Sequence, residues 1–224
     1  MAEIFDSLAL CDDRAQPRSA AASMAADEAL LATASQPILR VYSWQQPTIS
    51  FGYFIRVSDA RLAAPGGSAL MRRWTGGGIV PHGPDFTWSL IIPRNCPAAR
   101  LPPAESYQQF HRALASALAM AGFPSEQCPA ATPVPAGGLC FEAPAPGDLM
   151  QAGRKLAGAG QRRCRHGLLL QGSVAPLPLP PDFPRLLARS LAAAVTTFSP
   201  GDFPADLCET LTARYASPSW LGLR

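Results

Sequence analysis

The chain of 224 residues is 48% hydrophobic and 16% charged, a globular composition with ample material for a core. Its net charge of +3 is too small to indicate a nucleic-acid partner. No apolar run approaches the roughly 20 residues that cross a bilayer, and the first residues do not have the pattern of a secretory signal. We therefore expect one domain over residues 1–224, located in the cytoplasm, with no membrane or nucleic-acid partner.

Local patterns predict a helix and two strands near the start of the chain. Residues 19–34 predict a helix that Ser19 caps, because alanine and leucine favour helix formation. Two strands follow at 38–44 and 48–54, where apolar, aromatic and β-branched residues alternate or cluster. Only residues 45–47 separate these strands, so the pair predicts a hairpin.

The middle of the chain is expected to contain short strands and one long helix. The spacing of apolar residues predicts a helix over 104–121 that ends at Gly122. Residues 124–138 are rich in proline, alanine and glycine and are expected to form a mobile loop. The shorter elements predicted before the long helix are a helix near 59–63 and strands over 69–74, 79–80 and 86–92.

The remaining elements complete an expectation for the fold class. Strands are predicted over 148–151, 154–157 and 167–174, and helices over about 185–196 and 204–214. This order predicts an α+β fold with a mixed, largely antiparallel sheet flanked by helices. The glycine run before residue 79 is not followed by a helical pattern, which argues against a P-loop or a Rossmann fold.

The first candidate site is a glycine run with charged neighbours. Three consecutive glycines after a strand leave room for a ligand to lie against the backbone. An adjacent arginine pair can hold a carboxylate or phosphate, and a histidine can accept or donate a proton. A flexible turn with solvated arginines is the alternative. The candidate binding residues are Arg72, Arg73, Thr75, Gly76, Gly77, Gly78 and His82.

The second candidate site contains an unusual lysine and a cysteine. Lys155 is the only lysine among 19 basic residues, and small residues follow it. Lysine, unlike arginine, can lose or share its proton, although one lysine could also survive on a surface loop by chance. Cys140 stands 15 residues earlier, and nearby positive charge would make its thiol nucleophilic. A buried core thiol is the alternative for Cys140.

The cysteine spacing predicts no metal site. The six cysteines are scattered, and none forms a Cys-x-x-Cys pair. In a cytoplasmic protein such cysteines are expected to be free thiols.

Four segments in this order resemble the lipoate–protein ligase, octanoyltransferase and biotin–protein ligase family. They are residues 42–54, the arginine–glycine segment 72–82, Cys140-Phe141 with Asp148-Leu149, and the lysine segment 153–173. The resemblance implies a sheet similar to class II aminoacyl-tRNA synthetase and biotin synthetase cores. It also implies acyl transfer onto a lysine of a carrier domain.

Roles for single residues follow from the same resemblance. Lys155 would contact the acyl carbonyl or an acyl-phosphate, and the glycine motif would line the acyl tunnel. Asp148, Gly158 and Gln161 lie within the matching segments and join the candidate substrate-binding residues.

The resemblance is compatible with more than one acyl donor. Cys140 matches the nucleophile of one octanoyltransferase branch, which implies that octanoate leaves acyl carrier protein, rests on Cys140 as a thioester and needs no cofactor. The alternative is a lipoate ligase that uses free lipoate, ATP and magnesium, with Asp148 and Lys155 serving an acyl-adenylate. The implied acceptors are lipoyl domains of 2-oxoacid dehydrogenases or a glycine cleavage H-like protein.

Two positions depart from the family pattern. Gly83 stands where aspartate is more common after the histidine, and Gly147 stands where ligases have asparagine before Asp148. A non-catalytic module that binds acyl groups or carrier domains is therefore a third hypothesis.

Overall fold

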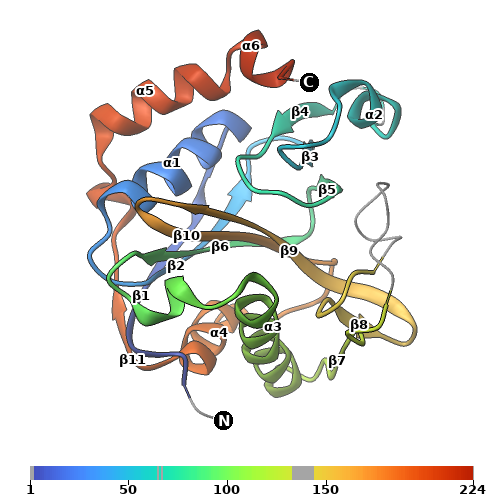
Figure 1. The fold of residues 1–224 in the computed structure, drawn as a ribbon, viewed down its shortest axis with the longest axis vertical. Helices are drawn as coiled ribbons and strands as arrows, with labels where there is room; N and C mark the ends of the chain where they lie inside the picture. The colour runs from blue at the N-terminus through green and yellow to red at the C-terminus, as the bar shows by residue number, and fades with distance from the viewer. Residues whose placement is uncertain (1–2, 65, 67, 133–143, 224) are drawn as a thin grey trace.

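The computed structural model describes residues 3–64, 66, 68–132 and 144–223, and its main feature is an eight-stranded sheet (Figure 1). The strand order is β11-β1-β2-β6-β10-β9-β8-β7. The strands are β1 (Phe5–Arg18), β2 (Ile38–Trp44), β6 (Phe86–Pro93), β7 (Glu126–Gln127), β8 (Leu149–Gln151), β9 (Arg154–Cys164), β10 (Gly167–Val174) and β11 (Ala192–Thr197).

The large sheet is mixed. β1 pairs in parallel with both β11 and β2, whereas the pairings from β2 across to β7 are antiparallel. This arrangement confirms the predicted α+β class with a mixed, largely antiparallel sheet.

A second sheet has the order β4-β3-β5 and consists of β3 (Thr48–Phe51), β4 (Ala69–Arg72) and β5 (Ile79–His82). The predicted hairpin between β2 and β3 is therefore wrong. Both edges of β2 are already paired, one with β1 and the other with β6, so β3 has no free edge to join. The chain leaves the large sheet after Trp44, and β3 begins the small sheet instead, between β4 and β5.

Helices cover both faces of the large sheet (Figure 1). One face carries α3 (Pro103–Met120) and α4 (Phe183–Leu191), and the other carries α1 (Ala20–Thr33), against which α5 (Ala205–Tyr215) packs. The helices predicted over 19–34, 104–121 and 204–214 are confirmed, as is the cap at Ser19, whose Oγ accepts from the N–H of Ala22. The short helices are α2 (Val57–Leu62) and α6 (Pro218–Leu221), with 3-10 turns at Pro97–Arg100 and Pro200–Asp202.

Alternation along β6 and β10 gives the large sheet two different faces. Trp88, Leu90 and Leu170 are buried in one apolar cluster with residues of α3 and α4. Their neighbours Ser89 and Gln171 point to the opposite face, because successive side chains in a strand alternate. The face toward α1 and the small sheet therefore carries these polar side chains, and Ile91 and Leu169 of the same face pack against α1.

Three further elements differ from the sequence prediction. Residues 192–197 form β11 rather than the end of a helix, because pairing with β1 outweighs the helix preference of their alanines. The strand predicted over 154–157 continues to Cys164, since β10 pairs along its whole length. β1 was not predicted, because charged residues interrupt its apolar pattern at Asp12, Asp13 and Arg14.

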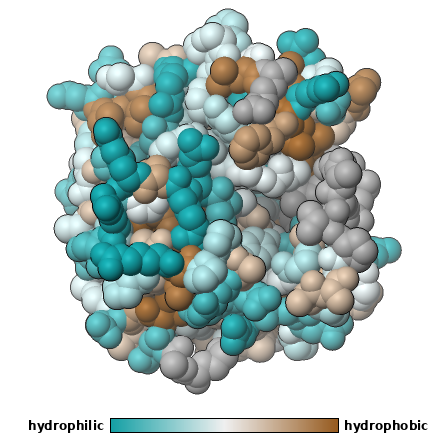
Figure 2. Space-filling model, viewed as in Figure 1, coloured by the Kyte–Doolittle hydropathy of each residue, from teal (hydrophilic) through white to brown (hydrophobic). Residues whose placement is uncertain are grey.

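The surface has a more hydrophobic area over the small sheet and α2 (Figure 2). Phe54, just after β3, is 65% exposed, and Leu62, at the end of α2, is 89% exposed. Among the helices that the structure describes, none has the length and apolar character required to span a membrane.

Candidate functional site

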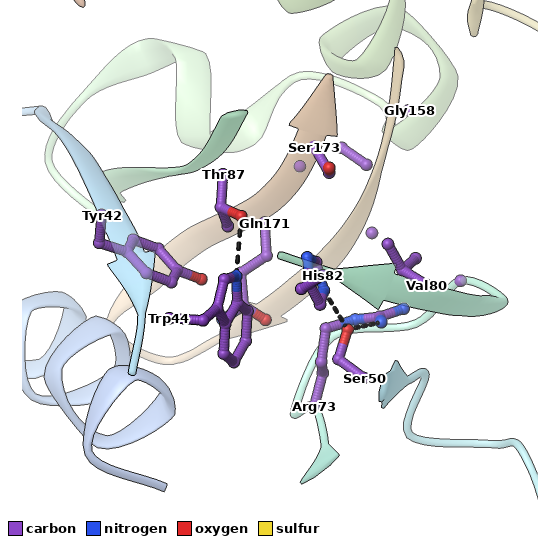
Figure 3. A pocket seen from close by; sticks show the side chains of 14 residues that line it. Tyr42, Trp44, Ser50, Arg73, Val80, His82, Thr87, Gly158, Gln171 and Ser173 are labelled. Carbon is purple, nitrogen blue, oxygen red and sulfur yellow. Dashed lines mark hydrogen bonds between the residues drawn. The ribbon is translucent and has the colours of Figure 1, made fainter. Parts of the chain in front are cut away.

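A pocket lies between the polar face of the large sheet and the small sheet (Figure 3). Its walls come from β2, β6, β9 and β10 on one side and from β3, β5 and the β4–β5 connection on the other. The empty space between its walls is about 440 Å³, a volume that includes solvent at the open mouth. Segments far apart in the sequence therefore meet around one slot.

Glycines allow the two sheets to approach closely at this slot. A Cβ atom on Gly160 of β9 would lie 2.3 Å from the carbonyl oxygen of Gly76, and one on Gly52 would lie 2.0 Å from that of Gly77. The φ angle of Gly77 is +95°, a conformation that favours glycine. The N–H of Gly76 donates to the carbonyl of Gln161 at 3.2 Å, which ties the glycine run to β9.

Lys155 lies directly behind the pocket lining, next to Gly158. Only 8% of the residue is exposed, and its Nζ lies 2.7 Å from Oδ2 of the fully buried Asp148. Oδ1 of Asp148 accepts from the Tyr107 hydroxyl at 2.5 Å, and the Tyr107 oxygen accepts from the N–H of Ala159 at 2.9 Å. A Cβ on Gly158 would lie 2.9 Å from Nζ, so this glycine provides the space for the ammonium.

His82 connects the pocket to a second cavity. It lines both, and the second cavity is also lined by Lys155 and Arg154 of β9. Its Nε2 lies 2.6 Å from the Ser50 Oγ and its Nδ1 lies 2.7 Å from Asp85 Oδ2. The imidazole ring stacks on Trp44 with centroids 4.3 Å apart.

The charge of His82 follows from these contacts. Burial lowers the pKa of His82, although Asp85 acts in the opposite direction. The ring is therefore neutral at neutral pH. A carboxylate can only accept, so Nδ1 carries the proton and donates to Asp85, while Nε2 accepts from the Ser50 hydroxyl.

Asp85 is a site residue that the sequence analysis missed. Its Oδ2 accepts from His82, from the Thr87 hydroxyl at 2.9 Å and from the Ser173 hydroxyl at 2.5 Å. Burial acts to raise the pKa of Asp85, but these donors and the N–H of Gly83 outweigh it and hold the pKa at about 2. The sequence signal that could have identified Asp85 is its position three residues after His82 and just before β6.

A buried polar network supports the inner wall of the pocket. The Thr75 hydroxyl donates to Gln171 Oε1 at 2.8 Å, and Gln171 Nε2 donates to Asp27 Oδ2 at 2.7 Å. Arg40 joins the other carboxylate oxygen of Asp27 to Asp13, at 2.8 Å on each side. All five residues are buried. The glycine run is thus connected to α1 and β1 through satisfied hydrogen bonds.

The two adjacent arginines have different surroundings. Arg73 lines the pocket, where Nη1 donates to the Ser50 Oγ at 2.6 Å. The guanidinium of Arg72 donates instead to the carbonyl oxygens of Tyr53, Ile55, Trp220 and Leu221. Arg72 therefore joins the small sheet to the C-terminal segment and does not line the pocket.

The other candidate residues lie partly in the pocket lining and partly outside it. Gly77 and Gly158 line the pocket, and Thr75 supports it through Gln171. The Gln161 side chain contacts Ser106 and the carbonyl of Pro103 near α3, outside the pocket lining. Cys140 lies outside the described residues. No group of three or more histidine, cysteine, aspartate or glutamate residues in the described part of the chain could hold a metal ion.

Comparisons with known proteins agree with this geometry. The family model of the lipoyl protein ligase A/B catalytic domain matches residues 19–186. The chain is 33% identical over 169 residues to the octanoyltransferase LipM of Kyrpidia tusciae, covering 70% of this chain and 62% of that protein. It is 34% identical over 166 residues to the octanoyltransferase LipM of Staphylococcus aureus, covering 68% and 60%. The chain thus spans about three fifths of the length of these curated relatives.

Two solved structures share the fold. A lipoate-protein ligase A bound with ATP has a TM-score of 0.76 and 19% identity, and the match covers 98% of this chain and 100% of that one. A bi-partite lipoate protein ligase from Thermoplasma acidophilum, described with its E2 lipoyl domain, has a TM-score of 0.65 and 18% identity over 100% and 98% of the two chains.

Proposed function

Because the chain belongs to the lipoyl protein ligase A/B catalytic-domain family, we propose that it transfers an octanoyl group from a donor thioester to a lysine of a lipoyl domain. The observation that carries the proposal is the placement of the single lysine, which is buried, paired with Asp148 and adjacent to Gly158 of the glycine-lined slot. The relatives named octanoyltransferase support the choice of acyl group.

The slot is suited to an alkyl chain. An octanoyl group buries about six methylenes at ~0.8 kcal/mol each, or about 5 kcal/mol of binding. This energy does not require a charged contact along the chain. The reacting carbonyl would then lie near Gly158, where the Lys155 ammonium can stabilise the negative charge of a tetrahedral intermediate.

The reaction has two steps under this proposal. The Cys140 thiolate attacks the donor thioester, and the donor thiol leaves. The amine of the acceptor lysine then attacks the acyl-enzyme, and the Cys140 thiolate leaves. Neither step requires ATP, magnesium or another cofactor. The proposed donor is octanoyl acyl carrier protein, and the proposed acceptor is a lipoyl domain of a 2-oxoacid dehydrogenase or a glycine cleavage H-like protein.

The contacts of Asp148 favour transfer over ATP-dependent ligation. A magnesium ligand needs a carboxylate oxygen available to the ion. One Asp148 oxygen accepts from Tyr107, and the other accepts from Lys155 and from the N–H of Ala145.

The five described cysteines are free thiols, in keeping with the reducing cytoplasm in which we place the reaction.

The test is an incubation with octanoyl acyl carrier protein and a lipoyl domain, with and without ATP and magnesium, followed by intact mass measurement. We expect octanoylated enzyme without ATP and an octanoylated acceptor. Cys140→Ala should form neither, whereas the control Cys208→Ala, in α5, should form both. Lys155→Ala should slow transfer by about 10²- to 10³-fold, the usual effect of losing one oxyanion donor.

The other outcomes select the other hypotheses. Acceptor modification that requires ATP and free lipoate would identify a ligase. Binding of the lipoyl domain without any modification under either condition would identify a non-catalytic module. Full transfer activity in Cys140→Ala would refute the thioester.

A further inference from the structure

His82 is distinguished from the other histidines by its position. All three histidines lie within the described residues, and neither His111 nor His166 lines the slot or the second cavity. His82 lines both, so it stands between the space proposed for the acyl chain and the space beside Lys155. Figure 3 shows its ring next to Ser50 and Arg73, at the small-sheet wall of the slot.

The surroundings of His82 have the order of a nucleophile–base–carboxylate chain. Ser50 Oγ lies 2.6 Å from Nε2, and Asp85 Oδ2 lies 2.7 Å from Nδ1. Carboxylates in this position hold the imidazole in one tautomer and stabilise the imidazolium that forms when the base accepts a proton. Hydrogen bonds from Thr87 and Ser173 hold Asp85 itself in place.

Several elements around His82 bring charged groups close to it. β6 contributes Asp85, the β4–β5 connection contributes Arg73, and Lys155 and Arg154 of β9 line the second cavity with it. β2 contributes only the uncharged ring of Trp44, and β3 contributes the Ser50 hydroxyl. The Ser50 oxygen accepts from Arg73 Nη1, so its own proton is directed to His82.

Acyl transfer to an amine requires a proton acceptor, and Lys155 is not suited to that task. The attacking nitrogen loses a proton as the C–N bond forms. The Lys155 Nζ is already engaged by the Asp148 carboxylate at 2.7 Å. The geometry points to His82 as the general base of the second step, with Ser50 as the hydroxyl through which the proton arrives. This inference rests on the proposed octanoyl transfer.

The step balances without another reactant. The neutral amine attacks the thioester carbonyl, the C–N bond forms, the C–S bond breaks, and the electron pair of that bond leaves on the Cys140 sulfur. One proton of the amine passes to Ser50 Oγ while the hydroxyl proton moves to His82 Nε2. Asp85 stabilises the imidazolium, which then releases its proton to solvent. The product amide keeps the second amine proton.

The experiment separates the two steps in a single turnover. Octanoyl-enzyme is formed first, a lipoyl domain is added, and both species are followed by mass spectrometry after rapid quenching. For His82→Gln we expect transfer to the acceptor to slow by about 10²- to 10⁴-fold, far more than the formation of octanoyl-enzyme slows. Ser50→Ala and Asp85→Asn should slow the same step, and His166→Gln, on the turn between β9 and β10, is the matched control.

A pH profile and rescue distinguish a base from a structural residue. The wild-type transfer rate should rise with pH until the base is deprotonated, and His82→Gln should lose this acidic limb. Added imidazole should accelerate His82→Ala but not His82→Gln, whose side chain fills the site. Equal slowing of both steps in His82→Gln, or a wild-type transfer rate in that variant, would overturn the inference about His82 but not the proposed function. Failure of the wild-type protein to form octanoyl-enzyme or to transfer octanoate would overturn the proposed function and the inference together.

Discussion

The two faces of the large sheet are built by the same strands but differ in chemistry. The face toward α3 and α4 buries Trp88, Leu90 and Leu170 in an apolar cluster. The face toward α1 and the small sheet buries ionised and hydrogen-bonded groups, including Arg40 and Gln171. One set of backbone hydrogen bonds therefore supports a stabilising core on one side and a site on the other.

The difference shows where a substitution should affect stability and where it should affect activity. Apolar burial stabilises in proportion to area and tolerates changes of shape, whereas a buried polar network depends on each partner being present. Four experiments, in order of expected effect, can test whether the two faces divide these tasks.

The largest effect is expected from breaking the polar face at Arg40. This fully buried guanidinium contacts both Asp13 and Asp27. Arg40→Met would leave the buried Asp27 without its cation and Asp13 with Arg18 alone, which should lower the free energy of unfolding by about 3–5 kcal/mol in denaturant titrations. Arg14→Ala removes an exposed ion pair with Asp12 and should cost only about 0–1 kcal/mol. Equal losses of stability in Arg40→Met and Arg14→Ala would show that burial of the ion pairs does not determine how much they stabilise the fold.

A smaller loss of stability, without loss of activity, is expected on the apolar face. Leu170 is fully buried against α3 and α4. Leu170→Ala should leave a cavity and lower the free energy of unfolding by about 3 kcal/mol. The transfer rate per folded molecule should stay at the wild-type value, because the slot lies on the other face. A loss of activity that exceeds the loss of folded protein would contradict the division between the faces.

The converse effect is expected at Gly158. An added Cβ would meet Asp148 Oδ1 at 2.7 Å and Lys155 Nζ at 2.9 Å, and the end of the lysine side chain can move. Gly158→Ala should therefore reduce transfer by about 100-fold, or about 2.7 kcal/mol, by displacing the ammonium from the carbonyl. Denaturant titration should detect little change in stability. Gly66→Ala, where a Cβ meets no atom within 4 Å, is the matched control.

The smallest effect concerns a titratable group on the apolar side. Burial lowers the pKa of His111 from 6.5 to about 4, against the opposing contact with the Tyr107 carbonyl. The unfolded chain therefore binds a proton between these values that the folded chain does not, and stability falls as the pH falls. Wild type should lose about 2 kcal/mol from this residue between pH 7 and pH 5.

His111→Gln should remove that part of the acid sensitivity in denaturant titrations at the two pH values. The remaining dependence should include His82, whose pKa is also lowered by burial and whose contribution has the same sign. A variant as acid-sensitive as wild type would contradict the assignment to His111.

Much of the fold was predictable where local pattern and final pairing agree. The helical spacing of Phe110, Leu114 and Leu118 predicts α3, and these side chains are buried. The hairpin between β2 and β3 was mispredicted because strand partners depend on which edges are already taken. The strand β11 was mispredicted because its alanines favour helix until β1 offers an edge.

The site was predictable in its motifs but not in its connections. Lys155, Gly158 and His82 have sequence signals, and the structure brings them to two neighbouring cavities that share His82. Tyr107 does not, because its hydrogen bond to Asp148 crosses the fold and has no local pattern. Arg72 and Arg73 are adjacent and chemically identical, so only the direction of each side chain separates their surroundings.

The contacts of Arg72 make the last residues of the chain part of the slot's support. Two of the four carbonyl oxygens around its guanidinium belong to Trp220 and Leu221, and the Trp220 indole donates back to the Arg72 carbonyl at 2.9 Å. A protein truncated after Ser217 would leave that buried cation short of acceptors, right beside the glycine run. Deletions that remove Trp220 and Leu221 should consequently disturb substrate binding.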